Sequence, residues 1–308
     1  MLKQRVITAL LLFLAFAGTL SVSVVWPFAF LTLLMIGAAG WEWSRLCGVT
    51  GAPQWGLGGV SVVAAAALAQ WMGVRGVTPA APSAMHLVVP HVHQAGQALV
   101  GFVVSAWVWW AALVIWVAGG AWALRFGSTS WKSIPPGLRM GLGVVVLSVA
   151  WLALAEGRGQ GVNFLLSMLV LVWAADIGAY FGGRAFGRRK LAPSISPGKS
   201  WEGVWSGFAA VVLVSIVWIG VDRSASVDSP SLYSHLLQGL GPFGMALALM
   251  FLTAMSVVGD LFESLIKRQA GVKDSSQLLP GHGGVLDRID ALLPVLPIQM
   301  AILSLCHA

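Results

Sequence analysis

Charged residues are scarce in this sequence. Asp, Glu, Lys and Arg together make up 9% of its 308 residues, whereas hydrophobic residues make up 58%. A soluble globular domain carries about 25% charged residues, so this composition excludes an ordinary soluble protein. The mean hydropathy of +0.85 instead indicates a chain that lies largely in lipid.

Cysteine and acidic residues are also few. Cys47 and Cys306 are predicted to lie near opposite membrane faces, so no disulfide is expected, and their spacing provides no zinc site. The 18 Lys and Arg residues exceed the 11 acids, and the net charge is +7. Because these bases are spread over short connections between apolar spans, they favour membrane orientation and phosphate ligands. No nucleic acid partner is expected.

Nine stretches are apolar enough, and most are long enough, to cross a hydrocarbon core of about 30 Å as helices. They are residues 6–22, 24–40, 55–72, 98–124, 138–155, 162–181, 204–221, 241–262 and 291–305. We therefore expect an all-α polytopic integral membrane protein with about nine transmembrane helices. The first two stretches are separated so briefly that a re-entrant pair is an alternative. By chemistry the chain divides into amino-terminal transmembrane helices, 1–155, and a carboxy-terminal transmembrane catalytic region, 156–308.

Basic residues are distributed unevenly about these spans. Threading nine helices with the amino terminus inside places 15 of the 18 Lys and Arg residues on one side, which the positive-inside bias makes cytoplasmic. The carboxy terminus is then outside. Residues 73–97 are predicted to form an outer loop, and its histidines (86, 91 and 93) lack carboxylate or Cys partners for a metal. The amino-terminal stretch resembles a secretory signal, but another span follows at once, which favours a retained helix.

Two acids interrupt apolar helices in the carboxy half. Asp176 lies inside an apolar stretch, where an ionisable side chain costs at least about 2.5 kcal/mol and usually faces a bundle interior or a wet cavity. A buried hydrogen bond to Tyr180 is the alternative. Asp260 ends the apolar run 243–258, where surface decoration is a poor explanation, and this position favours metal ligation.

A Gly-Lys-Ser step occupies residues 198–200. It is not a Walker phosphate loop, because that motif needs a glycine where this chain has Pro193. Ser196, Lys199 and Ser200 still suit a backbone bend that offers hydroxyl, ammonium and N–H donors to phosphate. The basic run 188–190 fits either phosphate binding or membrane orientation.

The densest polar stretch runs from residue 259 to 290. Asp260 and Glu263 stand three apart, as do Asp287 and Asp290, so each pair can share a helix face, and the two pairs flank a Gly-rich hairpin. For Glu263 an ion pair with the lysine four residues on is an alternative to ligation. His282, between two glycines, could be a base, a phosphate donor or a turn residue held by its backbone.

This stretch resembles the phosphatidate cytidylyltransferases, also called CDP-diacylglycerol synthases. The residues that match the family pattern in order and spacing are Ser264, Lys267, Arg268, Lys273, Asp274, His282, Gly283, Gly284, Asp287, Arg288 and Asp290. Residues 176–203 resemble the upstream conserved region of the family. The sequence departs from the pattern at Gly198, where a basic residue is expected, at Ser200, which replaces Thr, and at Ser276, which replaces a frequent Gly.

The resemblance implies a reaction and a set of roles. Phosphatidic acid would attack the α-phosphorus of CTP, giving CDP-diacylglycerol and pyrophosphate at the cytoplasmic face of a bacterial-type inner membrane. Mg²⁺ would be the cofactor, with a second cation left open. The implied catalytic residues are Asp260, Lys267, Arg268, Asp287 and Arg288. The implied substrate-binding residues are Asp176, Ser196, Lys199, Ser200, Lys273, Asp274, His282, Gly283 and Gly284. The implied metal ligands are Asp260, Asp287 and Asp290, and Asp290 could instead orient Arg288.

Two alternatives come from other classes of protein. An anion transporter also carries intramembrane charges, but it usually shows an inverted repeat, and this chain concentrates its polar residues in one half. A CTP-dependent polyprenol or lipid kinase would transfer the γ-phosphoryl group of CTP. The expected partners are CTP, phosphatidic acid and the bilayer, and a homodimer is left open.

Overall fold

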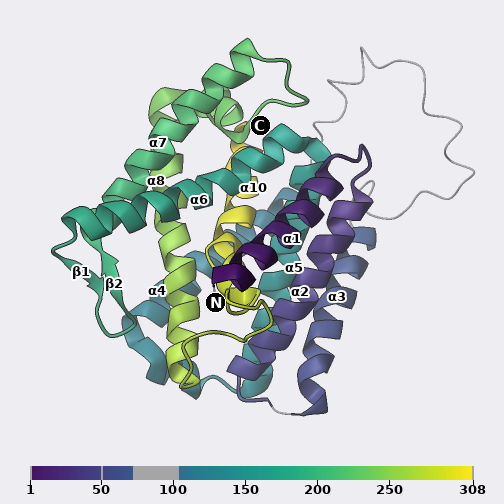
Figure 1. Ribbon diagram of the computed structural model, residues 1–308, viewed down its shortest axis with the longest axis vertical. Coiled ribbons are helices and arrows are strands. Elements are labelled where there is room, and N and C mark those ends of the chain that lie inside the picture. The colour runs from purple at the N-terminus through teal and green to yellow at the C-terminus, as the bar shows by residue number, and fades with distance from the viewer. Residues whose placement is uncertain (1, 50, 72–103, 307–308) are drawn as a thin grey trace, which may run out of the picture.

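The computed structural model describes residues 2–49, 51–71 and 104–306. These residues form ten helices and one short hairpin (Figure 1). The elements are α1 Leu2–Leu20, α2 Trp26–Leu46, α3 Ala52–Trp71, α4 Ala106–Ser133, α5 Pro136–Gln160, α6 Val162–Phe186, β1 Lys190–Ala192, β2 Ser196–Ser200, α7 Trp201–Ser224, α8 Leu232–Gln269, α9 Leu286–Ile289 and α10 Leu292–Cys306.

A helix overlaps each predicted apolar span, which confirms a helical membrane protein in outline. Within the described residues, six segments are long and apolar enough to cross a membrane: they belong to α4, α5, α6, α7, α8 and the α9–α10 region. The helices of residues 2–71 are not among those six, so the predicted count of nine is not confirmed. The predicted outer loop 73–97, with its three histidines, lies outside the described residues.

The helical fold carries one short hairpin that the sequence did not predict. β1 and β2 pair antiparallel, with Lys190 opposite Ser200 and Ala192 opposite Ser196. The Glu202 carboxylate in the first turn of α7 accepts hydrogen bonds from the backbone N–H groups of Arg188 (3.0 Å) and Arg189 (3.1 Å). The Gly-Lys-Ser step is therefore an extended strand held in place at the start of a helix, and not a loose bend.

Small residues bring α6 and α7 unusually close together. A Cβ added at Gly207 would lie 2.6 Å from the Ala175 carbonyl oxygen, and one added at Gly203 would lie 2.9 Å from that of Ala179. Glycines at such a contact let two helix backbones approach directly, as in other membrane helix pairs. This contact fixes the position of Asp176 on α6 relative to β2, which leads into α7.

Aromatic side chains hold α8 against the amino half. The Phe262 ring lies between Trp116 and Trp131, at centroid distances of 5.6 and 5.3 Å, and Trp43 lies at 6.2 Å. Trp43 also donates a hydrogen bond from Nε1 to the Arg139 carbonyl (2.9 Å). These rings fix the rotation of α8 about its axis, and therefore the direction of the acids on either side of Phe262.

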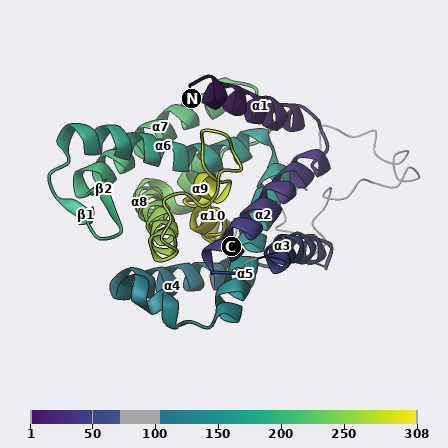
Figure 2. The same cartoon turned by 60° about the horizontal axis from the view of Figure 1, so that its bottom comes forward.

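The carboxy-terminal helices lie at the centre of the molecule. Figure 2 shows α8 and α10 between the α6–α7 pair on one side and α4 and α5 on the other. In Figure 1 the amino-terminal end of α1 lies beside the yellow loop between α8 and α9, and the chain ends at the far end of α10. The Thr8 hydroxyl donates a hydrogen bond to the Pro280 carbonyl in that loop (3.3 Å).

Candidate active site

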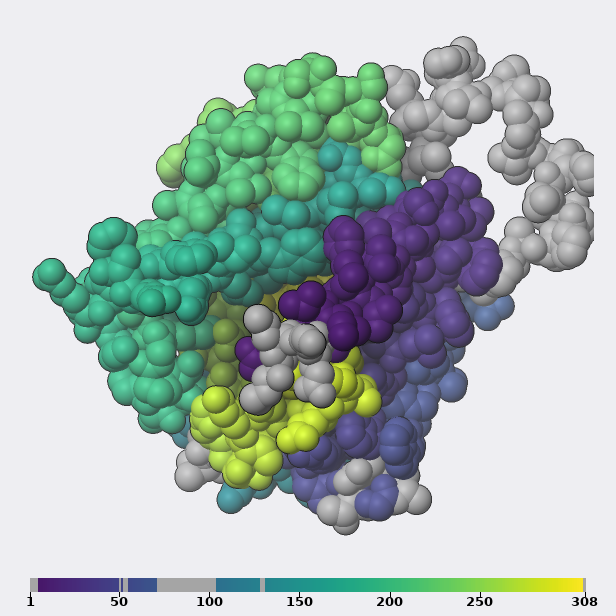
Figure 3. Space-filling model, viewed as in Figure 1, coloured from purple at the N-terminus to yellow at the C-terminus, as the bar shows by residue number. Residues whose placement is uncertain are grey.

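A cavity of about 620 Å³ lies between α6, the hairpin, α7 and α8. Figure 3 shows the surface hollowed between α6 and the loop after α8, with α8 at the bottom of the hollow. The predicted site residues that line this cavity are Asp176, Ser196, Lys199, Ser200 and Asp260. The structure thus brings the upstream motif together with the first acid of the signature stretch, 60 or more residues later.

Lys199 is the cation nearest the acids of this cavity. Its Nζ lies 2.6 Å from Asp260 Oδ2, and it also interacts electrostatically with Asp176. Asp176 receives only a long contact from the Ser256 hydroxyl (3.5 Å), while Tyr180 is mostly exposed, so the alternative bond between Asp176 and Tyr180 is not formed. Asp176 therefore faces a polar cavity, as its position in an apolar helix predicts.

Asp290 belongs electrostatically to the same group. It interacts with both Asp260 and Asp176, and its Oδ1 accepts a hydrogen bond from the Ala291 N–H (2.8 Å). Arg288 is oriented elsewhere: its Nε and Nη2 donate to the His282 carbonyl at 3.1 and 2.6 Å. Arg288 is therefore positioned by the His282 carbonyl rather than by Asp290.

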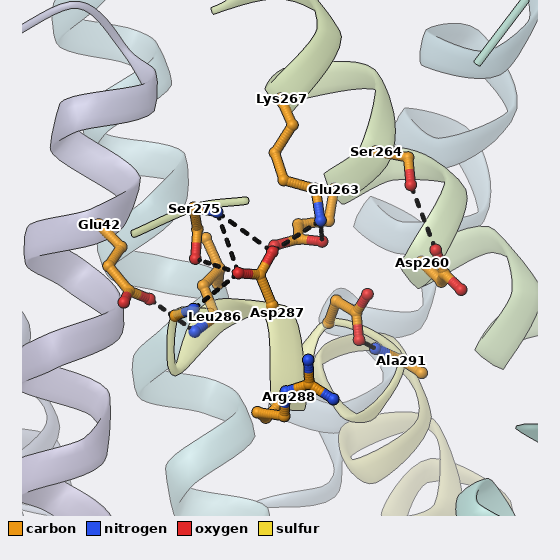
Figure 4. Close-up of polar contacts among 12 residues, drawn as sticks. Glu42, Asp260, Glu263, Ser264, Lys267, Ser275, Leu286, Asp287, Arg288 and Ala291 are labelled. Carbon is orange, nitrogen blue, oxygen red and sulfur yellow. Dashed lines mark hydrogen bonds and ion pairs between the residues drawn. The ribbon is translucent and has the colours of Figure 1, made fainter. Parts of the chain in front are cut away.

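A second polar cluster surrounds Asp287 (Figure 4). Its carboxylate accepts hydrogen bonds from Lys267 Nζ (2.7 Å), the Ser275 N–H and hydroxyl (both 3.0 Å) and the Gly284 N–H (2.8 Å). Lys267 also pairs with Glu263 at 2.5 Å, which confirms the helix ion pair proposed for Glu263. Because a carboxylate has about four lone-pair sites, these contacts engage most of the acceptor capacity of Asp287.

Glu42 on α2 is the functional candidate that sequence reasoning missed. It is completely buried, and its carboxylate accepts hydrogen bonds from the N–H groups of Val285 (3.0 Å) and Leu286 (2.6 Å) and from the Ser276 hydroxyl. The position of Glu42 within an apolar helix could have indicated a functional residue, as the position of Asp176 did. Ser276, a departure from the family pattern, is thus the partner of a buried acid.

The glycines of the signature loop are explained by backbone geometry. Gly281 and Gly283 have φ values of +78° and +86°, a region that favours glycine. A Cβ on Gly284 would overlap the Ser275 hydroxyl and the Glu42 carboxylate. His282 lies in this turn and donates its N–H to the Leu279 carbonyl (2.8 Å), which supports its interpretation as a turn residue held by its backbone.

Lys273, Asp274 and Arg268 do not line the cavity. Lys273 and Asp274 are exposed at the start of the loop. Arg268 is also exposed, and its Nε makes a long contact (3.5 Å) with the Ile195 carbonyl at the hairpin turn. Ser200 lines the cavity but its hydroxyl caps α7 by accepting from the Gly203 N–H (3.2 Å). The predicted set thus separates into a cavity group, a loop group around Asp287 and exposed cations.

Magnesium ligation stays a prediction. Within residues 2–49, 51–71 and 104–306, no group of three His, Cys, Asp or Glu side chains is arranged closely enough to hold a metal ion. The carboxylates of Asp176, Asp260 and Asp290 nevertheless repel one another across the cavity region. Oxygen donors with a surplus of negative charge fit a hard divalent cation such as Mg²⁺.

Comparison with known proteins agrees with the motif. The chain matches the family described as "Cytidylyltransferase family" over residues 3–306, and it belongs to this family. It is 37% identical over 306 residues to the phosphatidate cytidylyltransferase of Pseudomonas aeruginosa, covering 98% of this chain and 97% of the relative. It is 48% identical over 138 residues to that of Haemophilus influenzae, covering 45% and 44%, and 40% identical over 166 residues to that of Brucella suis, covering 54% and 56%. The resemblance predicted from the signature stretch is confirmed.

Proposed function

We propose that this chain transfers the CMP group of CTP to phosphatidic acid, and that the transfer takes place in the cavity lined by Asp176, Lys199 and Asp260. Similarity to phosphatidate cytidylyltransferases, in one case along almost the whole chain, supports the activity. The chain is a CTP-using nucleotidyltransferase of the membrane, and its products are CDP-diacylglycerol and pyrophosphate.

The observation that carries the location is the mixture of charges in one cavity. Asp176 and Asp260 lie on two different apolar helices and meet Lys199 from the hairpin. Arg184 and Lys190 line the same cavity and add positive charge. A nucleoside triphosphate bound with a divalent cation needs this combination, because basic groups neutralise phosphate oxygens and carboxylates hold the cation.

The chemistry requires positioning more than proton transfer. The phosphate monoester of phosphatidic acid has a second pKa of about 6, so it is largely dianionic at neutral pH and is already a nucleophile. Its oxygen forms a bond to the α-phosphorus of CTP, and the bond from that phosphorus to the β-bridging oxygen breaks as pyrophosphate leaves. Lys199 and Arg184 would orient the triphosphate and stabilise the charge that develops on its oxygens.

Asp260 and Asp290 are the two residues that would hold Mg²⁺, and Asp176 would add negative charge beside them. The ion when bound would neutralise phosphate charge and polarise the phosphoryl oxygens. Asp287, with Lys267, Ser275 and Gly284 on its oxygens, would contribute chiefly by fixing the loop unless one of these partners is displaced. Ligation of Mg²⁺ by Asp287 and binding of a second cation stay predictions.

We further propose that the cavity faces the cytoplasm of a bacterial-type inner membrane. The positive-inside bias supports this orientation, because threading the nine predicted spans puts 15 of the 18 basic residues on one side. The contact between Thr8 and Pro280 supports it too, because the basic amino terminus and the signature loop lie on the same side. A homodimer stays a prediction that light scattering of the detergent-solubilised protein tests.

The test uses purified protein in detergent with Mg²⁺, phosphatidic acid and CTP labelled at either the α- or the γ-phosphate. Label from the α-position is expected in CDP-diacylglycerol and label from the γ-position in pyrophosphate. Transfer of the γ-label to lipid would instead identify a lipid kinase, and absence of any CTP turnover would refute both. Asp260→Asn is expected to lose both products.

A further inference from the structure

A second cavity, of about 410 Å³, lies between α1, α2, α5, α6 and the α9–α10 region. Its wall is apolar except for Thr32 and Arg288. The Thr32 hydroxyl is already engaged, because it donates to the Phe28 and Ala29 carbonyls and accepts from Trp151 Nε1. Arg288 is therefore the one lining group, among the described residues, that offers charge to a ligand.

Arg288 keeps hydrogen-bonding capacity at this position. Its Nε and Nη2 donate to the His282 carbonyl, whereas Nη1 carries two further N–H donors. Within the described part of the chain, Arg288 has no carboxylate partner within 4.0 Å, unlike Lys199 and Lys267. A guanidinium with free donors is suited to a phosphate group.

The place of Arg288 in the chain connects the two cavities. Arg288 and Ile289 line the apolar cavity, while Asp290 interacts with Asp260 and Asp176 at the polar one. On α6, Trp173 lines the apolar cavity and Asp176, three residues later, lines the polar one. The two cavities therefore share a wall on α6, and Arg288 is two residues from Asp290 in the sequence.

From this arrangement we propose that the apolar cavity receives one acyl chain of phosphatidic acid, with the lipid phosphate at Arg288. The proposal rests on the proposed function and assigns a site to its lipid substrate. An apolar cavity that ends at a cation matches a ligand with a hydrocarbon chain joined to an anionic head. Pockets of about 260 and 140 Å³ along α4 are lined only by apolar residues and glycine, so they offer no contact to a head group.

The first helix forms the outer wall of this acyl-chain cavity. Leu12, Phe13, Ala15 and Phe16 of α1 line it, and Phe13 is 66% exposed. In Figure 3 α1, in purple, lies on the outer face of the molecule beside the yellow loop between α8 and α9. The cavity thus lies directly behind a helix whose other side faces the surroundings, which suits a ligand that arrives from the bilayer.

The experiment fills the cavity and varies the lipid. Ala150→Leu narrows it from α5, and Ala15→Leu narrows it from α1. Ala112→Leu, in the apolar pocket beside α4, is the matched control, because it adds the same side chain at a buried alanine away from Arg288. Pyrophosphate release is measured with dioleoyl and with dihexanoyl phosphatidic acid, at saturating CTP.

For Ala150→Leu and Ala15→Leu, KM for the dioleoyl lipid is expected to rise about tenfold or more. Hydrophobic pockets discriminate by about this factor between ligands that differ by one methylene group. KM for the dihexanoyl lipid and for CTP should stay as in the wild type, and Ala112→Leu should change none of them. An equal loss with both lipids, no change in either filled variant, or the same chain-length effect in Ala112→Leu would overturn the proposal.

A binding measurement separates this proposal from the proposed function. Phosphatidic acid with a photoreactive group at the end of one acyl chain is cross-linked to the wild-type protein, and the labelled peptides are identified. Label in α1, α2, α5, α6 or the α9–α10 region, which line the cavity, supports the site even if no CTP is turned over, and labelling confined to α3, α4, α7 and α8 refutes it. If Ala150→Leu does not fold, Ala15→Leu on the exposed helix and the photolabel decide.

Discussion

Replacing Glu42 by Gln tests whether the amino half supports the reaction through a single buried carboxylate. Glu42 accepts hydrogen bonds through both oxygens, from Val285 and Ser276 on one and from Leu286 on the other. A glutamine amide has one acceptor oxygen and one NH2 donor, so in either orientation a backbone N–H loses its acceptor and meets another donor. An unsatisfied buried donor costs about 1–3 kcal/mol.

That cost falls on the segment that leads to Asp287. Val285 and Leu286 begin α9, and Gly284 donates to Asp287 directly. If this free energy destabilises the ordered conformation of the loop, a smaller fraction of the enzyme is competent, and Glu42→Gln should lower kcat/KM for CTP by about one to two decades. The measurements are Mg²⁺-dependent pyrophosphate release and thermal unfolding of the same detergent-solubilised samples. Glu42→Asp, which keeps the charge but shortens the side chain, should recover part of the activity.

Glu156→Gln provides the matched control. Glu156 on α5 is also a buried acid, and its Oε2 accepts from the Val104 N–H (3.2 Å), but it makes no described contact with the signature loop. This variant should lose stability while its kcat/KM stays within about threefold of the wild type, which is under 1 kcal/mol in the barrier. Wild-type turnover and unfolding temperature in Glu42→Gln, or an equal loss of turnover in Glu156→Gln, would refute the reasoning.

Three further variants test the site itself. Asp260→Asn should abolish pyrophosphate release while the protein stays folded, because it removes a carboxylate from an apolar helix. Near-wild-type release at the Mg²⁺ concentration that half-saturates the wild type would count against metal ligation. Lys267→Ala should lower the unfolding temperature more than Arg268→Ala, since it leaves Glu263 and Asp287 as unpaired acids, a change that costs about 3–5 kcal/mol at a buried pair. Equal unfolding temperatures in a thermal melt would contradict this ranking. Arg268→Ala should lower turnover about tenfold if Arg268 contacts phosphate, and unchanged kinetics would assign it to membrane orientation only.

Local patterns predicted the helices and the membrane class well. Apolar runs located every long helix of the carboxy half, and the predicted start of the span 241–262 falls at the kink where Gly241 has a φ of +69° before Pro242. The i,i+4 spacing of Glu263 and Lys267 indicated their ion pair correctly. The hairpin was missed because strands of three and five residues are too short to show an alternating pattern.

Long-range contacts could not be read in the same way. Glu42 and Ser276 are 234 positions apart, and no local sequence pattern predicts the hydrogen bond between them. The commitment of Asp287 to Lys267 and Ser275 likewise depends on how the loop folds back on α8. An acid within the signature stretch was therefore easy to assign to a site from its motif, whereas the contacts of that acid could be known only from the fold.

The bond between Glu42 and the loop has a consequence for how the chain is made. A ribosome delivers α2 to the membrane long before Leu286, which is 244 positions later. Until then the Glu42 carboxylate lacks its three partners, and an unpaired acid in an apolar helix is costly. The amino-terminal helices are thus expected to reach their final packing only after the last part of the chain has been inserted, so assembly of the two halves is completed in one late step.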